Sequence, residues 1–425
     1  MKKLNYIDLF AGCGGLSEGF TASGFHPVAH VEMNNDACLS LKTRECFYYL
    51  KRRNKLDVYR SYLLGDITRD ELYSNVPQRI LNSVINETMS EEGMLHLFSE
   101  IDKRMIQQKV SHIDLIVGGP PCQAYSLVGR AVKEDGMRGD PRNYLYKLYI
   151  RVLTKYSPQM FVFENVPGLL TANNGKYFND MQKEFMDAGY SIDYRILNAR
   201  DFNVLQSRRR IILVGWKNKL NLSYPVFNKK KNNYLVEELL YDLPHIRAGQ
   251  SNNVYATNSI GNYLMETKIR KQNDVLTWHV SRPNIDRDIE IYKLVIEAWN
   301  NDKRRLKYTD LPEELCTHNN KTAFLDRFKV VAKDLPSCHT MMAHISKDGH
   351  YFIHPDIEQA RSITVREAAR IQSFPDDFYF EGSRTAAFTQ IGNAVPPLMA
   401  KEIAKKIKKL LEKTDEQRII NKTVL

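Results

Sequence analysis

The chain of 425 residues lacks several features that would place it in other classes of protein. Its six cysteines are scattered without a C-x-x-C pair, and neither cysteine nor histidine clusters at ligand spacing. We therefore expect no disulfide framework and no metal. No apolar run approaches the length of a membrane span, and Asp8 and the glycines behind it interrupt any signal-peptide core. The sequence predicts a cytoplasmic protein without membrane contact.

The chain has fewer acidic than basic residues. The chain carries 61 Lys and Arg against 50 Asp and Glu, which gives a formal net charge of +11. An excess of positive charge attracts polyanions. The composition therefore favours a nucleic acid partner without identifying one.

Short apolar runs alternate with helical patterns over the first half of the chain. Four of these runs are rich in Val, Ile and Phe and are bounded by Gly, Pro or polar residues: 6–10, 26–33, 114–119 and 159–166. Two further runs, 190–199 and 209–216, are predicted to close the same sheet as a terminal pair. This alternation predicts an α/β fold with a doubly wound, mostly parallel sheet. Ligands of such folds bind beyond the carboxyl ends of the strands.

The rest of the chain is patterned differently. The segment 67–112 is polar and favours helix, so we interpret it as a helical insertion between two strands. Periodicity fades after residue 216, which predicts a first domain over 1–216 and a second, smaller, irregular domain over 217–360. Residues 361–425 are predicted to form a return segment, in which a DNA-facing helix is followed by a C-terminal helix that packs back on the first domain.

A glycine-rich turn follows the first predicted strand. Gly12, Gly14 and Gly15 stand where the chain must turn tightly before a helix, and Glu32 follows twenty residues beyond Gly12 at the end of the next strand. A carboxylate there can accept hydrogen bonds from both hydroxyls of a ribose. The spacing departs from G-x-G-x-x-G, so it disfavours a pyrophosphate cofactor and leaves S-adenosylmethionine as a candidate. A tight turn without a ligand is the alternative.

A second candidate site begins at Cys122, which follows the strand and two prolines of "DLIVGGPPC". The prolines fix the backbone ahead of the thiol at the carboxyl edge of the sheet, where such folds carry out chemistry. Glu164, in "FENV", should lie on the same edge, and a thiolate beside a carboxyl group is a coherent catalytic pair. The alternatives are a buried apolar cysteine and a glutamate that caps a turn or pairs with an arginine.

Two basic segments are predicted to lie near this edge. Arginines of "QSRRR" (206–210) could bind phosphate or hold Glu164 in place, unless they form a solvated turn. The stretch 124–143 combines glycines with basic residues, and we interpret it as a loop that closes over a substrate rather than an ordinary surface loop.

Eight motifs of the chain occur in the order found in the DNA (cytosine-5) methyltransferases. They are "DLFAGCGG", Glu32, "GDIT", "GGPPCQAYS", "FENV", "QSRRR", "RSITVREAARIQSFPDDF" and "QIGNAVPP". On these motifs the chain resembles that family, in its bacterial restriction-modification type, over most of its length outside about 218–335. The resemblance implies a Rossmann-like methyltransferase fold and S-adenosyl-L-methionine as cofactor. It also implies that the irregular domain is a target recognition domain that reads double-stranded DNA.

The resemblance implies catalytic roles at matching positions. Cys122 is expected to attack carbon 6 of a cytosine flipped out of the duplex, while Glu164 hydrogen-bonds and protonates ring nitrogen 3. Carbon 5 then takes the methyl group and loses its proton. Arg208 is expected to support the flipped cytosine or Glu164.

The resemblance also implies two sets of binding residues. Cofactor contacts are expected from Phe10, Gly12, Gly14, Gly15, Glu32, Met33, Asp66 in "GDIT" and Asn393. DNA contacts are expected from Ser126, Arg130, Arg138, Gln206 and Arg210. In the recognition domain, Arg282, His339, Thr340 and the stretch 343–356 are candidates that could equally be structural.

Other functions remain open. A tRNA cytosine-5 methyltransferase would share these motifs, a catalytically silent DNA-binding protein would keep the fold, and an NAD-dependent oxidoreductase would share the first turn. The large variable region favours DNA, and intact Cys122 and Glu164 favour an active enzyme. We expect a monomer in the bacterial cytoplasm or nucleoid, functionally paired with a restriction endonuclease.

Overall fold

The computed structural model describes residues 3–121, 144–230, 232–318 and 325–423. The described residues form a seven-stranded sheet of order β3-β2-β1-β4-β5-β7-β6. Its strands are β1 (Leu4–Leu9), β2 (Phe25–Glu32), β3 (Val84–Asn86), β4 (Leu115–Gly118), β5 (Met160–Asn165), β6 (Tyr190–Asn198) and β7 (Arg209–Lys217). The first five strands pair in parallel, and β7 runs antiparallel to both β5 and β6. The predicted doubly wound, mostly parallel sheet is confirmed.

Alternate side chains of each strand enter two cores on opposite faces of the sheet. On one face, Ile7 and Phe161 pack with helices α6 (Met94–Gln108), α8 (Leu145–Tyr156) and α9 (Lys176–Asp187). On the other, Tyr6 and Met160 pack with α1 (Gly15–Ala22) and α14 (Pro397–Thr423). Successive residues of a strand point to opposite faces of the sheet. Tyr6 and Ile7, like Met160 and Phe161, therefore enter different cores.

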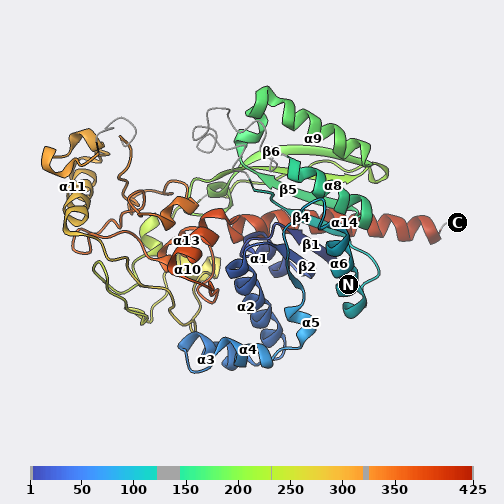
Figure 1. Cartoon of the computed structure of the whole chain (residues 1–425), viewed down its shortest axis with the longest axis horizontal. Coiled ribbons are helices and arrows are strands. Elements are labelled where there is room, and N and C mark those ends of the chain that lie inside the picture. Colours follow the sequence, from blue (N-terminus) through green and yellow to red (C-terminus); the bar gives the residue numbers. More distant parts are fainter. Residues whose placement is uncertain (1–2, 122–143, 231, 319–324, 424–425) are drawn as a thin grey trace.

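The C-terminal helix α14 lies directly against α1. A Cβ atom at Gly19 would come within 2.4 Å of the backbone carbon of Ala400, so the two helices approach more closely than any side chain at Gly19 would allow. The far end of α14 lies at the opposite end of the molecule from α11 (Asp286–Asp302) (Figure 1).

The segment 67–112 is more than the predicted helical insertion, because it contains the edge strand β3. Helix α2 (Asn35–Arg52) is followed by α3 (Leu56–Leu64), α4 (Arg69–Ser74) and α5 (Gln78–Leu81), and only then by β3. Phe47 and Leu50 of α2 form a small core of their own with Tyr59, Leu72 and Leu81. The buried apolar residues of these three short helices therefore pack against α2 rather than against the sheet.

Residues 218–360 contain little regular structure among those described. Their longest elements are α11 and the short helix α10 (Asn262–Thr267). One core joins α10 to α12 (Val365–Ile371) and α13 (Arg384–Asn393) of the return segment. A separate core surrounds α11, and this lobe stands away from the sheet at the left of Figure 1.

Helix α12 anchors this second region through buried charge. Arg370 is completely buried and forms ion pairs with Asp242 at 2.5 Å and with Asp376 at 2.6 Å. Arg361 is equally buried and pairs with Glu367 at 2.7 Å. The pair between Arg370 and Asp242 ties the return segment to the second region. Pairing offsets the cost of burial, since either charge alone would be costly to bury.

Two features are absent from the residues that the structure describes. None of the helices there is long and apolar enough to cross a membrane. No group of three His, Cys, Asp or Glu side chains in the same residues is arranged to hold a metal ion.

Candidate active site

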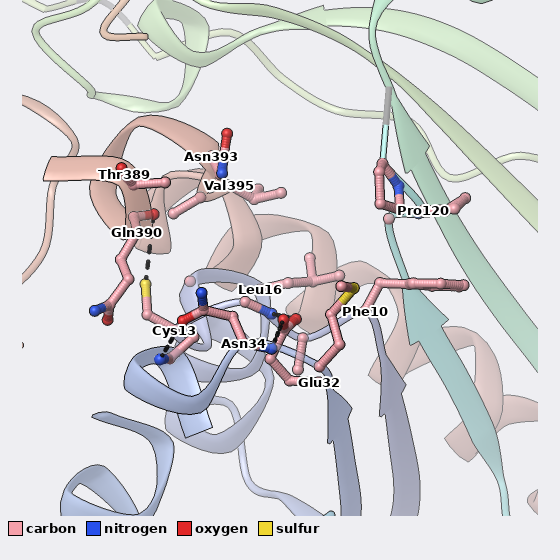
Figure 2. Close-up of a pocket in the computed structure, with 18 of the residues that line it drawn as sticks. Phe10, Cys13, Leu16, Glu32, Asn34, Pro120, Thr389, Gln390, Asn393 and Val395 are labelled. Carbon is pink, nitrogen blue, oxygen red and sulfur yellow. Dashed lines mark hydrogen bonds between the residues drawn. The ribbon is translucent and has the colours of Figure 1, made fainter. Parts of the chain in front are cut away.

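A pocket of about 720 Å³ opens at the carboxyl ends of β1, β2, β4 and β5, and α13 forms its opposite wall (Figure 2). Many of the residues predicted from sequence line it: Phe10, Gly12, Gly15, Glu32, Met33, Glu164, Arg208, Arg210 and Asn393. Residues proposed for cofactor binding, such as Glu32, therefore share one cavity with Glu164 and Arg208, two of those proposed for catalysis.

The glycine turn forms one side of this pocket. Phe10, Gly12 and Gly14 all adopt positive φ angles, of 55°, 56° and 93°. Gly14 lies behind the lining at the start of α1, where a Cβ atom would come within 2.7 Å of Leu41. At Gly15 a Cβ atom would lie 2.4 Å from the carbonyl oxygen of Val395, so the turn is pressed against the segment that follows α13. Nothing lies within 4 Å of a Cβ atom at Gly12, which therefore leaves the pocket open to a ligand.

Glu32 is fixed in the pocket by backbone amides. Its Oε2 accepts a hydrogen bond from the Gly12 N–H at 2.8 Å, and its Oε1 accepts one from the Asn34 N–H at 2.8 Å (Figure 2). Each carboxylate oxygen can accept more than one hydrogen bond, so both keep capacity for a ligand. The carboxylate is thus held in a set position relative to the turn, as recognition of a ribose diol requires.

The assignment of Asp66 to the cofactor requires correction. Asp66 is exposed between α3 and α4 and does not line the pocket, because the residues before it form a helix and not the expected strand. The third strand is β3, and the residues that follow it, Glu87, Thr88 and Met89, line the pocket instead. The Glu87 N–H donates to the Glu32 carbonyl oxygen at 3.0 Å. The run "SVINET" (83–88), apolar residues followed by polar ones, was the available sequence signal.

The thiol proposed as nucleophile, Cys122, lies outside the described residues. So do Ser126, Arg130, Arg138 and the whole predicted closing loop 124–143. The chain that leads to Cys122 does line the pocket, through Gly119, Pro120 and Pro121. A Cβ atom at Gly119 would lie 2.6 Å from Oε2 of Glu164. Because Gly119 has no side chain, the backbone that leads to Cys122 can lie directly beside that carboxyl group.

Cys13 is the described cysteine that lines the pocket, and it is unsuited to nucleophilic attack. Its side chain is 1% exposed, and its thiol donates to the Gln390 carbonyl oxygen at 3.7 Å. Burial raises the pKa of this thiol far above its ordinary value. It therefore stays protonated and acts as part of the core.

Glu164 is paired with an arginine, but not with the one we expected. The Nε of Arg210 lies 2.8 Å from Oε1 of Glu164, and each side chain is 13% exposed. Arg208 is buried and donates to the carbonyl oxygens of Met341 at 2.6 Å and Gly392 at 3.0 Å. Arg208 thus ties β7 to the second region and to the end of α13, while Arg210, expected to contact DNA, provides the ion pair with Glu164.

Gln206 also requires correction as a candidate for DNA contact. Its side chain is completely buried and donates to the Ile371 carbonyl oxygen at 3.2 Å and to Oε1 of Gln372 at 2.5 Å. Its own Oε1 accepts the Met341 N–H at 2.8 Å. With the amide engaged on both sides in the core, it is not available to DNA.

Three candidates in the second region have structural partners. Arg282 donates to the carbonyl oxygens of residues 345, 346 and 347. His339 is half-buried, stacks on Phe352 at 4.9 Å between ring centroids and bonds to the Tyr351 carbonyl oxygen. Thr340 donates to the Ser207 carbonyl oxygen at 2.6 Å. Each side chain thus has a role in folding this region.

The sequence of this chain matches a protein-family model and several curated relatives. The family model described as C-5 cytosine-specific DNA methylase matches residues 4–58 and 91–409. The type II methyltransferase M.Bpa9945I of Bacillus paralicheniformis is 41% identical over 440 residues, which cover 95% of this chain and 98% of the relative. The type II methyltransferase M1.HphI of Haemophilus parahaemolyticus is 30% identical, with 96% of this chain and 87% of the relative covered.

A solved structure shares the fold. It is described as a DNA modification methyltransferase encoded within a prophage of E. coli, and it aligns with a TM-score of 0.62 at 24% identity. The alignment covers 96% of this chain and 100% of that chain. The gap in the family match, residues 59–90, contains α4, α5 and β3, so the misassigned Asp66 falls where this chain departs from the family model.

Proposed function

The chain belongs to the C-5 cytosine-specific DNA methylases, and we propose which of its residues carry out methyl transfer from S-adenosylmethionine to carbon 5 of cytosine. The observation that carries the proposal is the single pocket lined by both Glu32 and Glu164. It brings a site for a nucleoside cofactor within reach of a carboxyl group suited to a cytosine ring.

The cofactor residues are those that present hydrogen-bond acceptors to the pocket. Glu32, fixed by two backbone N–H groups, accepts from the ribose hydroxyls. Glu87, at the end of the neighbouring strand, is placed to accept from the adenine amino group. Phe10, Met33 and Asn393 complete the contacts, and Met33 offers an apolar side chain that is 62% exposed at the pocket. S-adenosylmethionine supplies an electrophilic methyl group there.

The cytosine residues come from the next two strands. Cys122 adds as a thiolate to carbon 6, and Glu164, oriented by Arg210, donates a proton to nitrogen 3. The ring becomes an enamine, so carbon 5 can attack the methyl group. A base then takes the carbon 5 proton, Cys122 leaves carbon 6 as the thiolate, and nitrogen 3 returns its proton to Glu164. Since these ring atoms cannot be reached inside a duplex, the base must be flipped into the pocket.

We further propose that the enzyme acts on double-stranded DNA as a monomer in the bacterial cytoplasm and protects that DNA from a cognate restriction endonuclease. The relatives named above are type II methyltransferases, which supports DNA over the tRNA alternative. Plasmid and tRNA substrates offered with labelled S-adenosylmethionine should give label in plasmid DNA alone. Label confined to tRNA would contradict the proposal.

The modified site is found by bisulfite sequencing of DNA from a host that expresses the protein. Protected cytosines should fall within one short sequence, and cytosines of that sequence should be unprotected in DNA of a host that expresses Cys122→Ser. Cys316→Ser, which alters a cysteine of the α11 lobe, is the matched control and should leave the pattern unchanged. Scattered or missing protection with the wild-type protein would contradict sequence-specific methylation.

A further inference from the structure

A buried chain of polar side chains lies directly beneath the glycine turn. Ser17 donates a hydrogen bond to Oδ2 of Asp8, and its Oγ lies 3.1 Å from Nδ1 of His30. On the far side of the imidazole, Nε2 lies 3.5 Å from Oε1 of Glu45. Asp8, Ser17, His30 and Glu45 are exposed by 1%, 5%, 1% and 7%. They come from β1, α1, β2 and α2, the four elements that build the cofactor side of the pocket.

The direction of the hydrogen bonds follows from the hydroxyl. Ser17 has one hydrogen, and it is given to Asp8, so the contact with His30 is made by Nδ1–H donating to Ser17. The Nε2 atom of His30 then faces the carboxylate of Glu45. The polar chain thus runs from the Asp8 carboxylate through the Ser17 hydroxyl and the His30 imidazole to the Glu45 carboxylate.

Asp8 is the member of this chain that lines the pocket. Its buried surroundings include other titratable groups: the phenols of Tyr6 and Tyr149 and the carboxylate of Glu32. Burial raises the pKa of Asp8 to about 6, against the opposing effects of His30 and of the hydrogen bond from Ser17. Asp8 is therefore charged at neutral pH, although it is almost completely shielded from water.

A buried negative charge in this position would act on the difference in charge between the cofactor and its product. S-adenosylmethionine carries a positive sulfonium, whereas S-adenosylhomocysteine has lost the methyl group and carries a neutral thioether. We propose that Asp8, positioned by Ser17 and His30, makes the pocket discriminate in favour of the sulfonium form. The proposal rests on the cofactor site described above and adds to it a residue that sets selectivity between cofactor and product.

The first test compares the dissociation constants of the two ligands by calorimetry at pH 7.5. In Asp8→Asn, which keeps the shape and removes the charge, affinity for S-adenosylmethionine should fall roughly tenfold more than affinity for S-adenosylhomocysteine. Asp57→Asn, an exposed carboxylate in the first turn of α3, is the matched control and should alter neither. Equal changes for the two ligands in Asp8→Asn would overturn the proposal.

The second test uses the wild-type protein and so does not depend on how the variant folds. The ratio of the two affinities should shift toward the product as pH falls from 7.5 to 5. Binding of S-adenosylmethionine near pH 6 should release protons, because the sulfonium stabilises the charged carboxylate, and binding of the product should release fewer. Comparing buffers of different ionisation enthalpy measures this release. A ratio independent of pH, with equal proton release, would overturn the proposal.

The positioning role of Ser17 is tested by the ratio of the two affinities and by its dependence on pH. Ser17→Ala should lower the affinity ratio at pH 7.5 and move its midpoint to higher pH, whereas Ser17→Thr, which keeps the hydroxyl, should restore both. A uniform loss of affinity for both ligands in Ser17→Ala would contradict a positioning role. Failure of the wild-type protein to bind either ligand would overturn the cofactor site itself, and this proposal with it.

Discussion

The guanidinium Nε of Arg210 lies 2.8 Å from Oε1 of Glu164, in a pocket where both side chains are only 13% exposed. A second carboxylate of the same pocket, Glu32, is held by backbone amides rather than by an arginine. The two carboxylates are therefore positioned by different means, and each can be disturbed without the other.

Removal of the Arg210 side chain should impair chemistry more than cofactor binding. In Arg210→Ala, Glu164 loses the partner that orients it toward a cytosine ring, so kcat should fall on the order of a hundredfold. The dissociation constant of S-adenosylmethionine should change little. Steady-state kinetics with a DNA substrate, together with calorimetry, measure both. Arg209→Ala removes the exposed neighbouring arginine and should cost far less. Equal losses in the two variants would contradict the role of Arg210.

Substitution of Glu87 should weaken cofactor binding. Glu87→Gln replaces an acceptor-only carboxylate by an amide, and loss of one charge-assisted hydrogen bond should lower affinity roughly ten- to a hundredfold. Asp66→Asn is the matched control, since Asp66 is exposed and outside the pocket. Calorimetry with S-adenosylhomocysteine provides the measurement. A larger effect at Asp66 than at Glu87 would restore the assignment made from the "GDIT" motif.

The buried ion pairs of α12 should be needed for stability. Arg370→Leu leaves Asp242 and Asp376 buried without this partner, and the free energy of unfolding should fall by about 3–5 kcal/mol. Arg247→Leu, at an exposed position, should change it far less. Urea unfolding followed by tryptophan fluorescence or circular dichroism gives both values. A loss in Arg370→Leu no larger than in the control would show that the pairs do not hold this region.

Mild acid should destabilise the protein in part through His339 and His354, which take up protons more readily in the unfolded chain. Burial lowers the pKa of His339 to about 4 and that of His354 to about 3, below the value near 6.5 expected for the unfolded chain. Below pH 6.5 the unfolded state therefore binds more protons. Stability falls until pH reaches the folded values. Asp8, whose pKa is raised to about 6, opposes this trend between about pH 6 and 4.

Thermal unfolding between pH 8 and pH 5 measures this dependence. The melting temperature should fall with acid, and the slope should be shallower in the double variant His339→Gln with His354→Gln. His245→Gln, whose side chain is 76% exposed, should keep the wild-type slope. An unchanged slope in the double variant would assign the acid sensitivity to other groups.

The sequence predicted six of the seven strands to within two residues, and five of these six consist mostly of buried residues, whereas β6 is half-buried or exposed over most of its length. It missed β3 because three residues are too short to show a period, and the polar helices before it hid the true length of the connection. The resulting misassignment of Asp66 came from applying a motif across an insertion.

The burial of polar and charged side chains was harder to predict than the strands, for a different reason. Gln206 stands beside three arginines and looks like part of a surface turn, yet its partners lie more than a hundred positions away, at Met341 and Gln372. Arg361 and Arg370 likewise resemble a solvated helix face but are completely buried. Burial of this kind depends on which distant segments pack together, and the local sequence pattern does not predict that packing.

We propose that the pocket lined by Glu32 and Glu164 serves covalent catalysis by Cys122. This is tested with DNA in which the target cytosine is replaced by 5-fluorocytosine, incubated with the enzyme and S-adenosylmethionine. Because fluorine at carbon 5 cannot leave as a proton does, we expect a denaturation-resistant adduct of one protein per target site, attached through Cys122. An adduct that forms equally in Cys122→Ser, or methylation without any adduct, would contradict it.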